Sequence, residues 1–484
     1  MAVPTWGDAP PSHLTCVRDP GHAVSLGATG VLARFITGRP AGTACGTSTL
    51  TALVDTVAVA VAGRAADSAD AVMGWLDDEE HAPGPAAVWG SGEFRSPATA
   101  ALINGTAAHA LDWDDAVPSM AMHPGAVLFP ALLAQASRWP EVSGPELLAA
   151  YDIGNAVFRA VTELAPDTVH YGRGWHTTAT VGRLAAAAAA ARLARLDETK
   201  TRYALGIAAS CAAGSLANFG TMTKPLHAGL AARDAVTAVA LAERGCTANT
   251  EQLEHPKGFF ALYGDVDAAD PAFTRKLAAR LEYWAAHWPE DWAVKRYPSC
   301  YATHRSIDAA RWLRAEAGFP PPDDVESVKI TVHAGGLRPL IGHSPRTGLE
   351  GKFSLPYTIA VTLLRGTVRL GDFTDDAFDG TLADPAAAAL MDRIEAFEEP
   401  GFHGAEVELD LAGGRRLAKR AEVSHGDSRD PLTVSELEEK TREALGAAGW
   451  TAGEADTLAA GLRDLARVPD LDGLQQLLAN GGTA

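Results

Sequence analysis

The stretch from Gly182 to Leu196 reads GRLAAAAAAARLARL, and an unbroken run of alanines fills its centre. Alanine has the highest helix propensity, and its small side chain lets neighbouring helices approach closely. Because alanine covers every face of the segment, the pattern predicts a helix that is buried on all sides. Hydrophobic residues make up 47% of the whole chain and aromatic residues only 7%, so the rest of the sequence has a similar character. The sequence therefore predicts a mainly α-helical protein.

The length of the chain predicts two folding units. At 484 residues, it exceeds the usual size of one domain. From about Ala23 to Leu281 the pattern predicts successive helices separated by Gly and Pro. The composition then changes in the segment WAAHWPEDWAVKRYP, residues 284–298, where tryptophan and proline interrupt the helical pattern. We therefore expect a first unit over residues 20–288 and a second unit from residue 289.

The second unit has a mixed pattern. Val325–Ala334, VESVKITVHA, alternates as a strand does, and His403–Ser424 contains two strand-like runs joined by a Gly-Gly turn. Leu355–Leu364 and Ala386–Ala396 are predicted helices. Residues 289–429 are therefore predicted to form a smaller α+β domain.

The C-terminal segment returns to a purely helical pattern. It begins with Thr433–Glu436, TVSE, a typical capping box at the start of a helix. We expect residues 430–484 to pack on the first unit and complete it. The predicted fold class is mainly α, with a large all-helical domain and a smaller α+β domain.

Charge and cysteine content exclude several classes of partner and location. The formal net charge is −19, which disfavours binding to nucleic acid or to an anionic membrane surface. No secretion signal or apolar run long enough to span a membrane is found, so a cytoplasmic location is expected. The cysteines are odd in number and widely spaced, which is not typical of a disulfide framework or a structural zinc site. They are Cys16, Cys45, Cys211, Cys246 and Cys300.

The most informative polar segment is NGTAAHALDWDDAVPSMAMHPGAVLFP, residues 104–130. Asp112, Asp114 and Asp115 lie so close together that, once buried, they need cations or a raised pKa. His123 precedes a Pro-Gly pair at the start of an apolar helix, where an imidazole and backbone N–H groups can face one anion. A solvated helix end and a metal site are the alternatives. The DWDD run lacks the spacing of a calcium loop or a zinc motif, so no metal is predicted.

Two further segments carry histidine or lysine in small-residue surroundings. GRGWHTTATVG, residues 172–182, places His176 at a helix start, where it is either a packed core histidine or a site residue. NFGTMTKPLHAG, residues 218–229, contains Lys224 and His227. A lysine in such an apolar neighbourhood either extends toward solvent or faces an anion.

The segment KRYPSCYATH, residues 295–304, lies at the expected domain boundary, where ligand pockets often form. It offers the cations Lys295 and Arg296. Cys300 with His304 suggests a thiol nucleophile, but catalytic Cys/His pairs meet in space rather than at a fixed spacing, so this reading carries little weight.

These segments, in this order, together with LEGKFSLPY at residues 349–357, resemble the signature blocks of the MmgE/PrpD family. The resemblance spans most of the chain. It implies an all-helical domain completed by the C-terminus, an α+β lid domain, a homodimer, no metal or organic cofactor, and a pocket between the domains. It also implies a set of pocket residues. They are Asp112, His123, His176, Lys224 and Lys295.

The family's activities include 2-methylcitrate dehydration, cis-aconitate decarboxylation and iminodisuccinate epimerisation. The TKPLH tract resembles the decarboxylase and epimerase branches. Three positions depart from the decarboxylase pattern: Ala116 stands where that branch has threonine, Cys300 where it has histidine, and its tyrosine is replaced near Pro339–Ile341.

All these reactions form an enolate-like species beside a carboxylate, which requires cations at the carboxylate and a positioned acid or base. We therefore expect a cofactor-independent lyase for a small di- or tricarboxylic acid, with dehydration as the first candidate. Decarboxylation, epimerisation and a non-catalytic carboxylate-binding homologue are the alternatives. The expected residues with catalytic roles are His176, Asp112 and Lys224. The expected substrate-binding residues are His123, Lys295, His227, Arg296 and Cys300.

Overall fold

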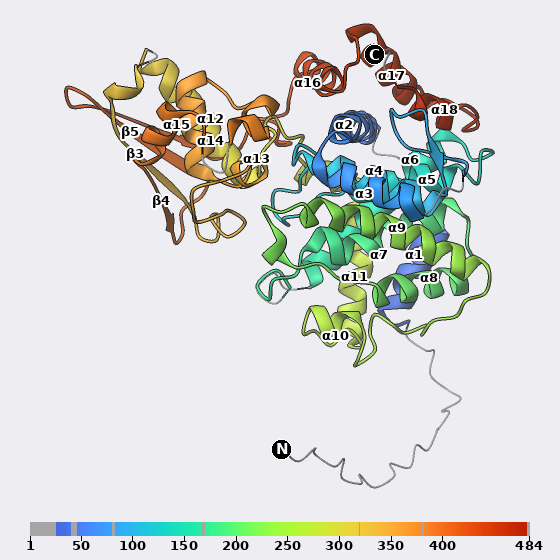
Figure 1. Ribbon diagram of the computed structural model, residues 1–484. Helices are drawn as coiled ribbons and strands as arrows, with labels where there is room; N and C mark the ends of the chain where they lie inside the picture. The colour runs from blue at the N-terminus through green and yellow to red at the C-terminus, as the bar shows by residue number, and fades with distance from the viewer. Residues whose placement is uncertain are drawn as a thin grey trace, which may run out of the picture.

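The protein consists of a large helical unit beside a smaller unit built on a β-sheet (Figure 1). A computed structural model describes residues 26–39, 46–79, 83–165, 170–318, 320–378 and 382–481. Each unit has its own hydrophobic core within these ranges. The predicted mainly α fold with a smaller α+β domain is thus confirmed. The predicted start of the first unit at residue 20, as well as Cys16 and Cys45, lies outside the described residues.

The large unit contains most of the helices. They are α1 (Ala28–Gly38), α2 (Thr47–Gly63), α3 (Asp67–Glu79), α4 (Pro97–Ala110), α5 (Gly125–Ala136), α6 (Gly144–Leu164), α7 (Thr177–Leu193), α8 (Glu198–Ser210), α9 (Thr223–Glu243), α10 (Phe259–Tyr263) and α11 (Pro271–His287). Short 3-10 helices η1 (Leu216–Asn218) and η2 (Trp288–Asp291) and a two-stranded sheet of β1 (Ala86–Ala87) and β2 (Phe94–Arg95) complete the N-terminal part.

Small residues set the packing of this helical unit. The alanine run forms the centre of α7, which is buried along nearly its whole length, as predicted. Helices α4 and α9 approach closely, with Gly105 facing Gly229. A Cβ atom built on Gly229 would lie 2.2 Å from Thr106 Oγ1 and 2.3 Å from the carbonyl oxygen of Leu102. Only glycine fits at this crossing, because any side chain would force the two backbones apart.

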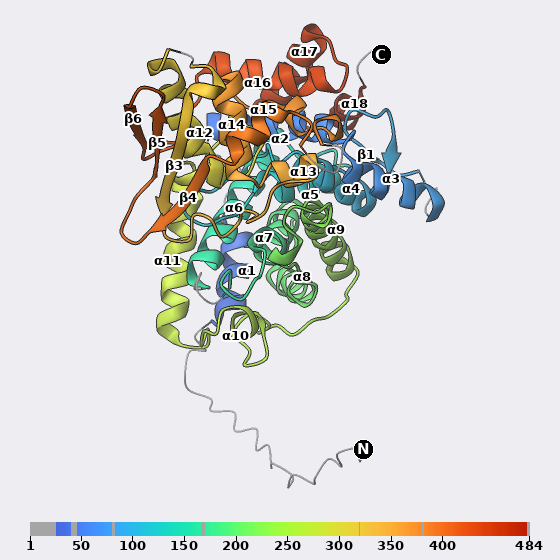
Figure 2. The same cartoon turned by 60° about the vertical axis from the view of Figure 1, so that its left-hand side comes forward.

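The smaller unit is an α+β domain. Its sheet has the order β4-β3-β5-β6, with β3 parallel to β4 and antiparallel to β5. Helices α12 and α14 pack on one face of the sheet (Figure 2). The strands are β3 (Val325–His333), β4 (Ile394–Glu399), β5 (Ala405–Leu411) and β6 (Arg415–Ala421). The helices are α12 (Tyr301–Glu316), α13 (Gly348–Gly351), α14 (Leu355–Arg365) and α15 (Pro385–Met391), with 3-10 turns η3 (Pro322–Asp324), η4 (Leu370–Phe373) and η5 (Asp375–Ala377).

The predicted elements of this domain agree with the structure except in one place. β3, the hairpin of β5 and β6, and α14 are confirmed, and Gly413 and Gly414 adopt the positive φ angles that the tight turn requires. The prediction of a helix over Ala386–Ala396 is wrong after Met391. Helix α15 ends at Met391, and β4 begins at Ile394. Parallel pairing with β3 decides the conformation there, a long-range contact that local periodicity does not reveal.

The C-terminal helices lie on the large unit. They are α16 (Val434–Ala447), α17 (Ala452–Asp464) and α18 (Leu474–Ala479), and Figure 1 shows them above α2. The predicted capping box of Thr433 and Glu436 is present at the start of α16. Lys440 of α16 is buried, with its ammonium 2.6 Å from Asp55 Oδ1 of α2 and 2.9 Å from the carbonyl oxygen of Trp113. This tail is therefore anchored next to the DWDD run. The domain boundaries at residues 288/289 and 429/430 stay predictions.

No single helix among the described residues is long and apolar enough to cross a membrane. Helices α2 and α3 reach the required length only together, across a bend of 73°.

The α4–α9 crossing gives a stability prediction. Gly229→Ala should lower the free energy of unfolding by about 1–3 kcal/mol, because the added methyl overlaps the backbone of α4. Gly74→Ala is the matched control, since Gly74 lies exposed inside α3 with no atom near its Cβ direction. The control should be neutral or gain up to about 1 kcal/mol from helix propensity. Urea unfolding measures both variants, and equal effects would contradict the close approach of the two helices.

Candidate functional site

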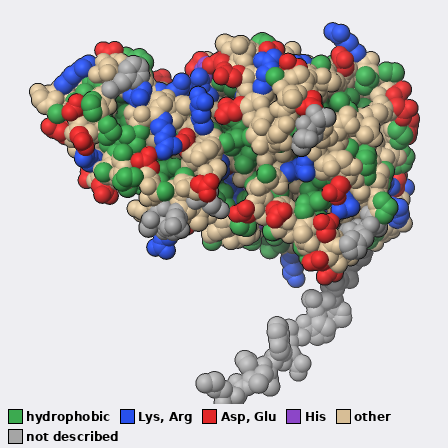
Figure 3. Space-filling view, turned by 45° about the horizontal axis from the view of Figure 1, so that its top comes forward, with side chains coloured by type: hydrophobic (Ala, Val, Ile, Leu, Met, Phe, Trp, Pro, Cys, Tyr) green, Lys and Arg blue, Asp and Glu red, His purple; other side chains and the backbone are tan. Residues whose placement is uncertain are grey.

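A cavity of about 510 Å³ lies between the two units. That volume is within the usual range for small-molecule sites. The large unit contributes the loop Ala116–His123 and the side chains of Asp112, His176 and Lys224. The smaller unit contributes the start of α12, the end of β3 and Phe353. On the face drawn in Figure 3, Lys and Arg side chains lie near the junction of the two lobes, with Asp and Glu side chains interspersed.

Asp112 is the centre of the charged groups. It follows the last turn of α4 and has a positive φ of 50°, a conformation that aspartate tolerates better than most residues. Its Oδ1 accepts from Lys224 Nζ at 3.0 Å and from Lys295 Nζ at 2.7 Å. Lys295 also donates to the backbone oxygen of Asp112 at 2.9 Å. One carboxylate oxygen therefore holds two ammonium groups from α9 and from the segment that joins the units.

Asp112, Lys224 and Lys295 form a buried ion triad, in which one carboxylate is paired with two ammonium groups. Burial alone would raise the pKa of Asp112, but Lys224 and Lys295 hold it well below its usual range. Burial would likewise lower the pKa of Lys295, yet Asp112 and Asp114 raise it. All three residues are at most 3% exposed. Oδ2 of Asp112 is buried and has no hydrogen-bond partner among the described residues.

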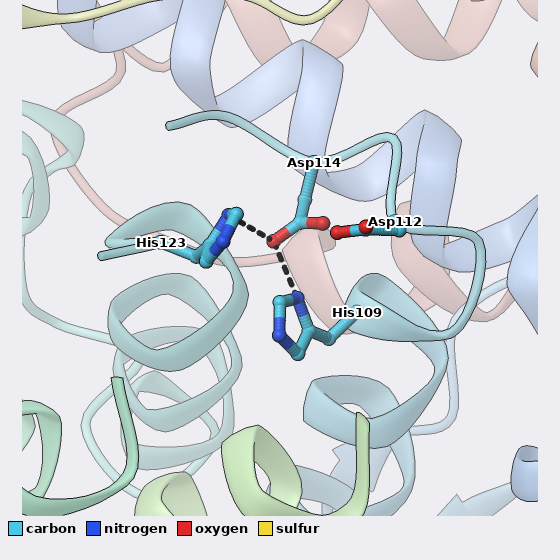
Figure 4. A group of neighbouring side chains, drawn as sticks. All are labelled: His109, Asp112, Asp114 and His123. Carbon is cyan, nitrogen blue, oxygen red and sulfur yellow. Dashed lines mark hydrogen bonds and ion pairs between the residues drawn. The ribbon is translucent and has the colours of Figure 1, made fainter. Parts of the chain in front are cut away.

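A second carboxylate, Asp114, organises two histidines (Figure 4). Its Oδ2 lies 2.8 Å from His109 Nδ1 and 3.4 Å from His123 Nδ1. The other nitrogen of His109, Nε2, lies 2.9 Å from Lys224 Nζ. Since an ammonium only donates, His109 accepts at Nε2 and carries its proton on Nδ1, toward Asp114. Asp114, His109, Lys224 and Asp112 thus form one continuous hydrogen-bonded chain.

His109, Asp112, Asp114 and His123 lie close enough together to raise the question of a metal ion, since one donor atom of each falls within 4.8 Å of the others. The surrounding charges do not favour a cation. Two ammonium groups contact Asp112 directly, and a divalent ion at that carboxylate would be repelled by both. The donor set therefore fits an anion site better than a metal site, and the absence of a resident metal stays a prediction.

His176 stands at the N-terminal end of α7 and lines the cavity. Its Nδ1 lies 3.1 Å from His227 Nδ1, and Phe219 packs edge-on against its ring. Its Nε2 is buried and has no partner among the described residues. Burial holds its pKa well below the usual range, and Lys224 acts in the same direction. A neutral imidazole therefore presents one nitrogen to the cavity.

His123 is held by backbone groups at the start of α5. Its Nδ1 donates to the carbonyl oxygen of Asp115 at 2.8 Å, and its backbone N–H donates to Thr178 Oγ1 at 3.2 Å. Asp115 accepts from the backbone N–H of Gly125 and from Trp292 Nε1, each at 2.8 Å. A Cβ on Gly125 would lie 2.3 Å from Thr56 Oγ1, so the glycine of the HPG motif is required for packing. Burial raises the pKa of Asp115 to about 7. Its hydrogen bonds to Gly125 and Trp292 make it a structural group behind the site.

The structure brings most of the predicted site residues together. Asp112, His123, His176, Lys224 and Cys300 line the cavity. Lys295 lies directly behind Asp112 and is fully buried. Whether these residues act on a ligand stays a prediction.

Two predicted substrate-binding residues, Arg296 and His227, do not line the cavity. The side chain of Arg296 lines a different hollow, and its Nη1 lies 3.1 Å from Glu436 Oε1 of α16. Arg296 and Glu436 line this second hollow, which is separate from the cavity that contains Asp112. His227 lies behind His176 and meets it through Nδ1. Sequence spacing alone could not distinguish the two sides of these segments.

Cys300 lines the cavity but is poorly suited to be a nucleophile. It caps α12, and its backbone N–H donates to the carbonyl oxygen of Lys352 at 2.9 Å. Burial raises the pKa of its thiol to about 11, with Asp112 acting in the same direction, so the thiol stays protonated near neutral pH. His304 does not face this thiol as a base: its Nε2 approaches the carbonyl oxygen of Ser299 at 3.2 Å.

Two central residues were not singled out from the sequence. His109 lies one helical turn before Asp112, a spacing that could have indicated it. Lys352 belongs to the LEGKFSLPY block and is buried, with its ammonium 2.9 Å from the carbonyl oxygen of Leu111 and 3.0 Å from that of Pro298. It therefore ties the C-terminus of α4 to the segment that carries Lys295. Burial lowers its pKa to about 7, although Asp112 opposes this shift.

The positions that depart from the decarboxylase pattern also lie at the cavity. Ala116 lines it and pairs with Ala293 through two backbone hydrogen bonds of 2.9 Å. Pro339 lines it without a hydroxyl group. Tyr301 lines it from α12, with its hydroxyl 3.3 Å from Asp427 Oδ2. The cavity therefore has a tyrosine on α12, whereas the resemblance implied one near Pro339–Ile341.

A helical domain and an α+β domain with a lysine- and histidine-rich cavity between them define a two-domain protein with a site suited to small anions. Comparison with protein families identifies both domains. The MmgE/PrpD N-terminal domain matches residues 30–271, and the MmgE/PrpD C-terminal domain matches residues 297–459. The chain belongs to the MmgE/PrpD family.

Curated relatives cover most of the chain. Cis-aconitate decarboxylase of Homo sapiens is 31% identical over 369 residues, which are 73% of this chain and 74% of the relative. The enzyme of the same name from Mus musculus is 30% identical over 371 residues, 73% of each chain. Cis-aconitate decarboxylase of Aspergillus terreus is 24% identical over 419 residues, 81% of this chain and 80% of the relative.

The buried triad gives a second prediction. Asp112→Asn keeps the shape of the side chain but leaves two buried ammonium groups without their counter-charge, so it should cost about 3–5 kcal/mol of unfolding free energy. Asp456→Asn breaks an exposed pair with Arg442 and should cost less than about 1 kcal/mol. Urea unfolding of both variants gives the comparison. An Asp112→Asn loss no larger than that of the control would show that the triad is not an energetic unit.

Lys352 gives a prediction about pH. The folded state holds its proton only up to about pH 7, whereas the unfolded chain holds it up to the ordinary value of 10.5. Between these limits the unfolded chain binds more protons, so the contribution of Lys352 to stability rises as the pH rises. Lys352→Met should reduce this slope, measured by urea unfolding between about pH 7 and 10. Lys329→Met, at a half-exposed lysine of β3, should keep the original slope. An unchanged slope in Lys352→Met would contradict the lowered pKa.

Proposed function

We propose that this protein is a cofactor-independent lyase that decarboxylates cis-aconitate or a close analogue. One observation carries the proposal: His176, whose buried Nε2 has no partner among the described residues, lines the same cavity as Lys224 and Asp112, and Lys295 pairs with that Asp112. Such a site offers a proton donor beside groups that bind carboxylates. The names of the human, mouse and fungal relatives support this choice of reaction and substrate.

The charges of the cavity suit a polyanion. Lys224 contacts the cavity directly, and Lys295 and Lys352 lie behind its wall. Arg305 of α12 lines the opposite side and forms no ion pair among the described residues. Cations on both units therefore suit carboxylates at both ends of one acid. The Coulomb attraction is strong here because the groups are largely withdrawn from water.

The proposed step balances as follows. In cis-aconitate the bond between the methylene carbon and its carboxylate breaks, and CO₂ leaves. The electron pair forms a new double bond to the central carbon, and the pair of the old double bond moves to the far alkene carbon, beside a second carboxylate. His176 Nε2 delivers a proton to that carbon. A trianion and one proton thus give CO₂ and a dianion with a terminal CH₂=C double bond.

The residues have separate parts in this scheme. Lys224, with His123 beside it, holds the carboxylate that takes up negative charge, which lowers the energy of the enolate-like state. Asp112 is fully ionised, so it fixes the two lysines rather than donating a proton. Lys295 acts through Asp112. A general acid such as His176 typically contributes about 10²–10⁴-fold in rate.

Dehydration, the reaction placed first on sequence grounds, is the second candidate. The specific observation in its favour is that Ala116 and Cys300 line the cavity where the decarboxylase branch has threonine and histidine. A hydro-lyase would use His176 to protonate the departing hydroxyl. A homodimer and a cytoplasmic location, both expected from the sequence, are part of the proposal for either reaction.

The function is tested with a panel of acids. Purified protein is incubated with cis-aconitate, citrate, 2-methylcitrate and iminodisuccinate, while CO₂ release, water loss and exchange of the α-proton are recorded. We expect CO₂ release from cis-aconitate that is insensitive to chelators. Water loss without CO₂ release would favour the second candidate, and tight binding without any product would indicate a non-catalytic homologue.

Substitutions then test the site. His176→Ala and Lys224→Ala should lower kcat/KM by about 10²-fold or more, because each removes a group that contacts the reacting acid. Lys419→Ala, at a lysine of β6 that packs on Trp312, is the control and should keep full activity. Circular dichroism confirms folding of each variant. Full activity of both site variants would refute the assignment.

A further inference from the structure

Two imidazole rings meet at the back of the cavity through like atoms. His176 Nδ1 and His227 Nδ1 are 3.1 Å apart, and the ring planes are inclined by 49°. A hydrogen bond between two such nitrogens requires that one of them carries a proton and the other does not. The protonation of His176 is therefore tied to that of His227.

The two rings differ in what they face. His176 is 1% exposed and lines the cavity, and its Nε2 is buried there. His227 does not line the cavity and keeps 6% of its surface exposed. It lies beneath Gly214, a loop residue whose neighbours Ala213 and Ser215 are exposed. His227 thus lies between His176 and the loop that carries Gly214.

The surrounding charges keep both rings neutral in the free protein. Burial lowers the pKa of His227 to about 4, and His109, Arg183 and Lys224 act in the same direction. The Arg183 guanidinium is itself paired with Asp234 at 2.8 Å. With both rings neutral, two arrangements exist. Either His227 donates and His176 carries its proton on Nε2 in the cavity, or His176 donates and its Nε2 presents a lone pair.

We infer that His227 is a positioning residue that donates its Nδ1 proton to His176, so that His176 faces the cavity as an acid, and that it replaces the proton of His176 within the same step. The inference rests on the proposed lyase function, which consumes one proton for each CO₂ released. It gives His227 a role without contact to the substrate.

The proton transfer balances over the two rings. His176 gives its Nε2 proton to the substrate carbon and takes the proton of His227 Nδ1 on its own Nδ1. His227 takes a proton from water at Nε2. After the product leaves, water entering the cavity protonates His176 Nε2, His176 returns its Nδ1 proton to His227 Nδ1, and His227 releases its Nε2 proton to water. Over a full turnover, the proton gained by the substrate therefore comes from water. No ring becomes an imidazolate at any point.

Gly214 makes this arrangement possible. Its φ of 135° and its carbonyl oxygen, which accepts from the backbone N–H of His176 at 3.1 Å, bring the loop against both rings. A Cβ on Gly214 would lie 2.5 Å from that of Ala179 and 3.5 Å from His227 Nδ1. The loop therefore passes directly over the pair and fixes the distance between the rings.

The first test does not depend on activity. In protein labelled with ¹⁵N-histidine, long-range ¹H–¹⁵N spectra distinguish a protonated from an unprotonated ring nitrogen. We expect the unmodified protein to show His176 protonated on Nε2 and His227 on Nδ1. His227→Phe should remove this preference at His176, whereas His227→Gln should keep it, because the glutamine amide can donate to Nδ1. A His176 proton on Nδ1 in the unmodified protein would overturn the inference.

Kinetic measurements separate the positioning of His176 by His227 from the transfer of a proton between them. His227→Gln should keep KM within about twofold but lower kcat by about tenfold or more, with a larger solvent isotope effect, since glutamine cannot pass a proton on. In His227→Ala, added imidazole should restore part of kcat. His343→Gln, at an exposed histidine, is the matched control. If both His227 variants retain kcat while His176→Ala loses it, the inference fails and the lyase proposal stands. If the unmodified protein converts no acid, the lyase proposal fails and the spectra alone decide the pairing.

Discussion

The site depends on the close approach of α4 and α9 at Gly105 and Gly229. This crossing sets the end of α4, with His109 and Asp112, against the first turn of α9, with Lys224. A larger residue at either glycine would move the two helix ends apart, and hydrogen bonds of about 3 Å tolerate little displacement. The alanine-rich composition of the large unit serves the same end, because helices with small side chains approach closely enough to hold polar groups between them.

Asp112 holds the two lysines of the site in place. Two buried lysines would repel each other and be expensive to desolvate, and one ionised carboxylate between them offsets both effects. The left-handed conformation of Asp112 directs the carboxylate into that position instead of continuing the helix. Lys352 of the smaller unit donates to the carbonyl oxygens of Leu111 and Pro298. These residues lie next to Asp112 and near Lys295 in the chain, so the domain interface and the ion triad support each other. Binding geometry and folding are thus linked in the same few residues.

Part of this organisation could be predicted from the sequence. The polar blocks stand out against an alanine-rich background, and their order along the chain indicated one pocket. The sequence could not separate Lys295 from Arg296, because both are cations in one short segment and only their partners, Asp112 and Glu436, decide which side chain lies at the site. His109 was missed although its spacing to Asp112 is local, and β4 was missed because its pairing with β3 overrides a helix-like composition. The failures at Arg296 and β4 share a cause, since each depends on a contact between segments far apart in the chain.

The acidic protein as a whole contrasts with the lysine-containing cavity that is proposed to bind a polycarboxylate. The chain carries a net charge of −19, yet its cavity gathers lysines around carboxylates that already balance part of their charge. Without a ligand, burial and these lysines keep His176 and His123 neutral. A bound polycarboxylate would reverse the balance, because each negative charge placed near an imidazole raises its pKa. The proton affinity of His176 would therefore rise only when an anionic acid occupies the cavity, which couples occupancy of the site to readiness of its proton donor.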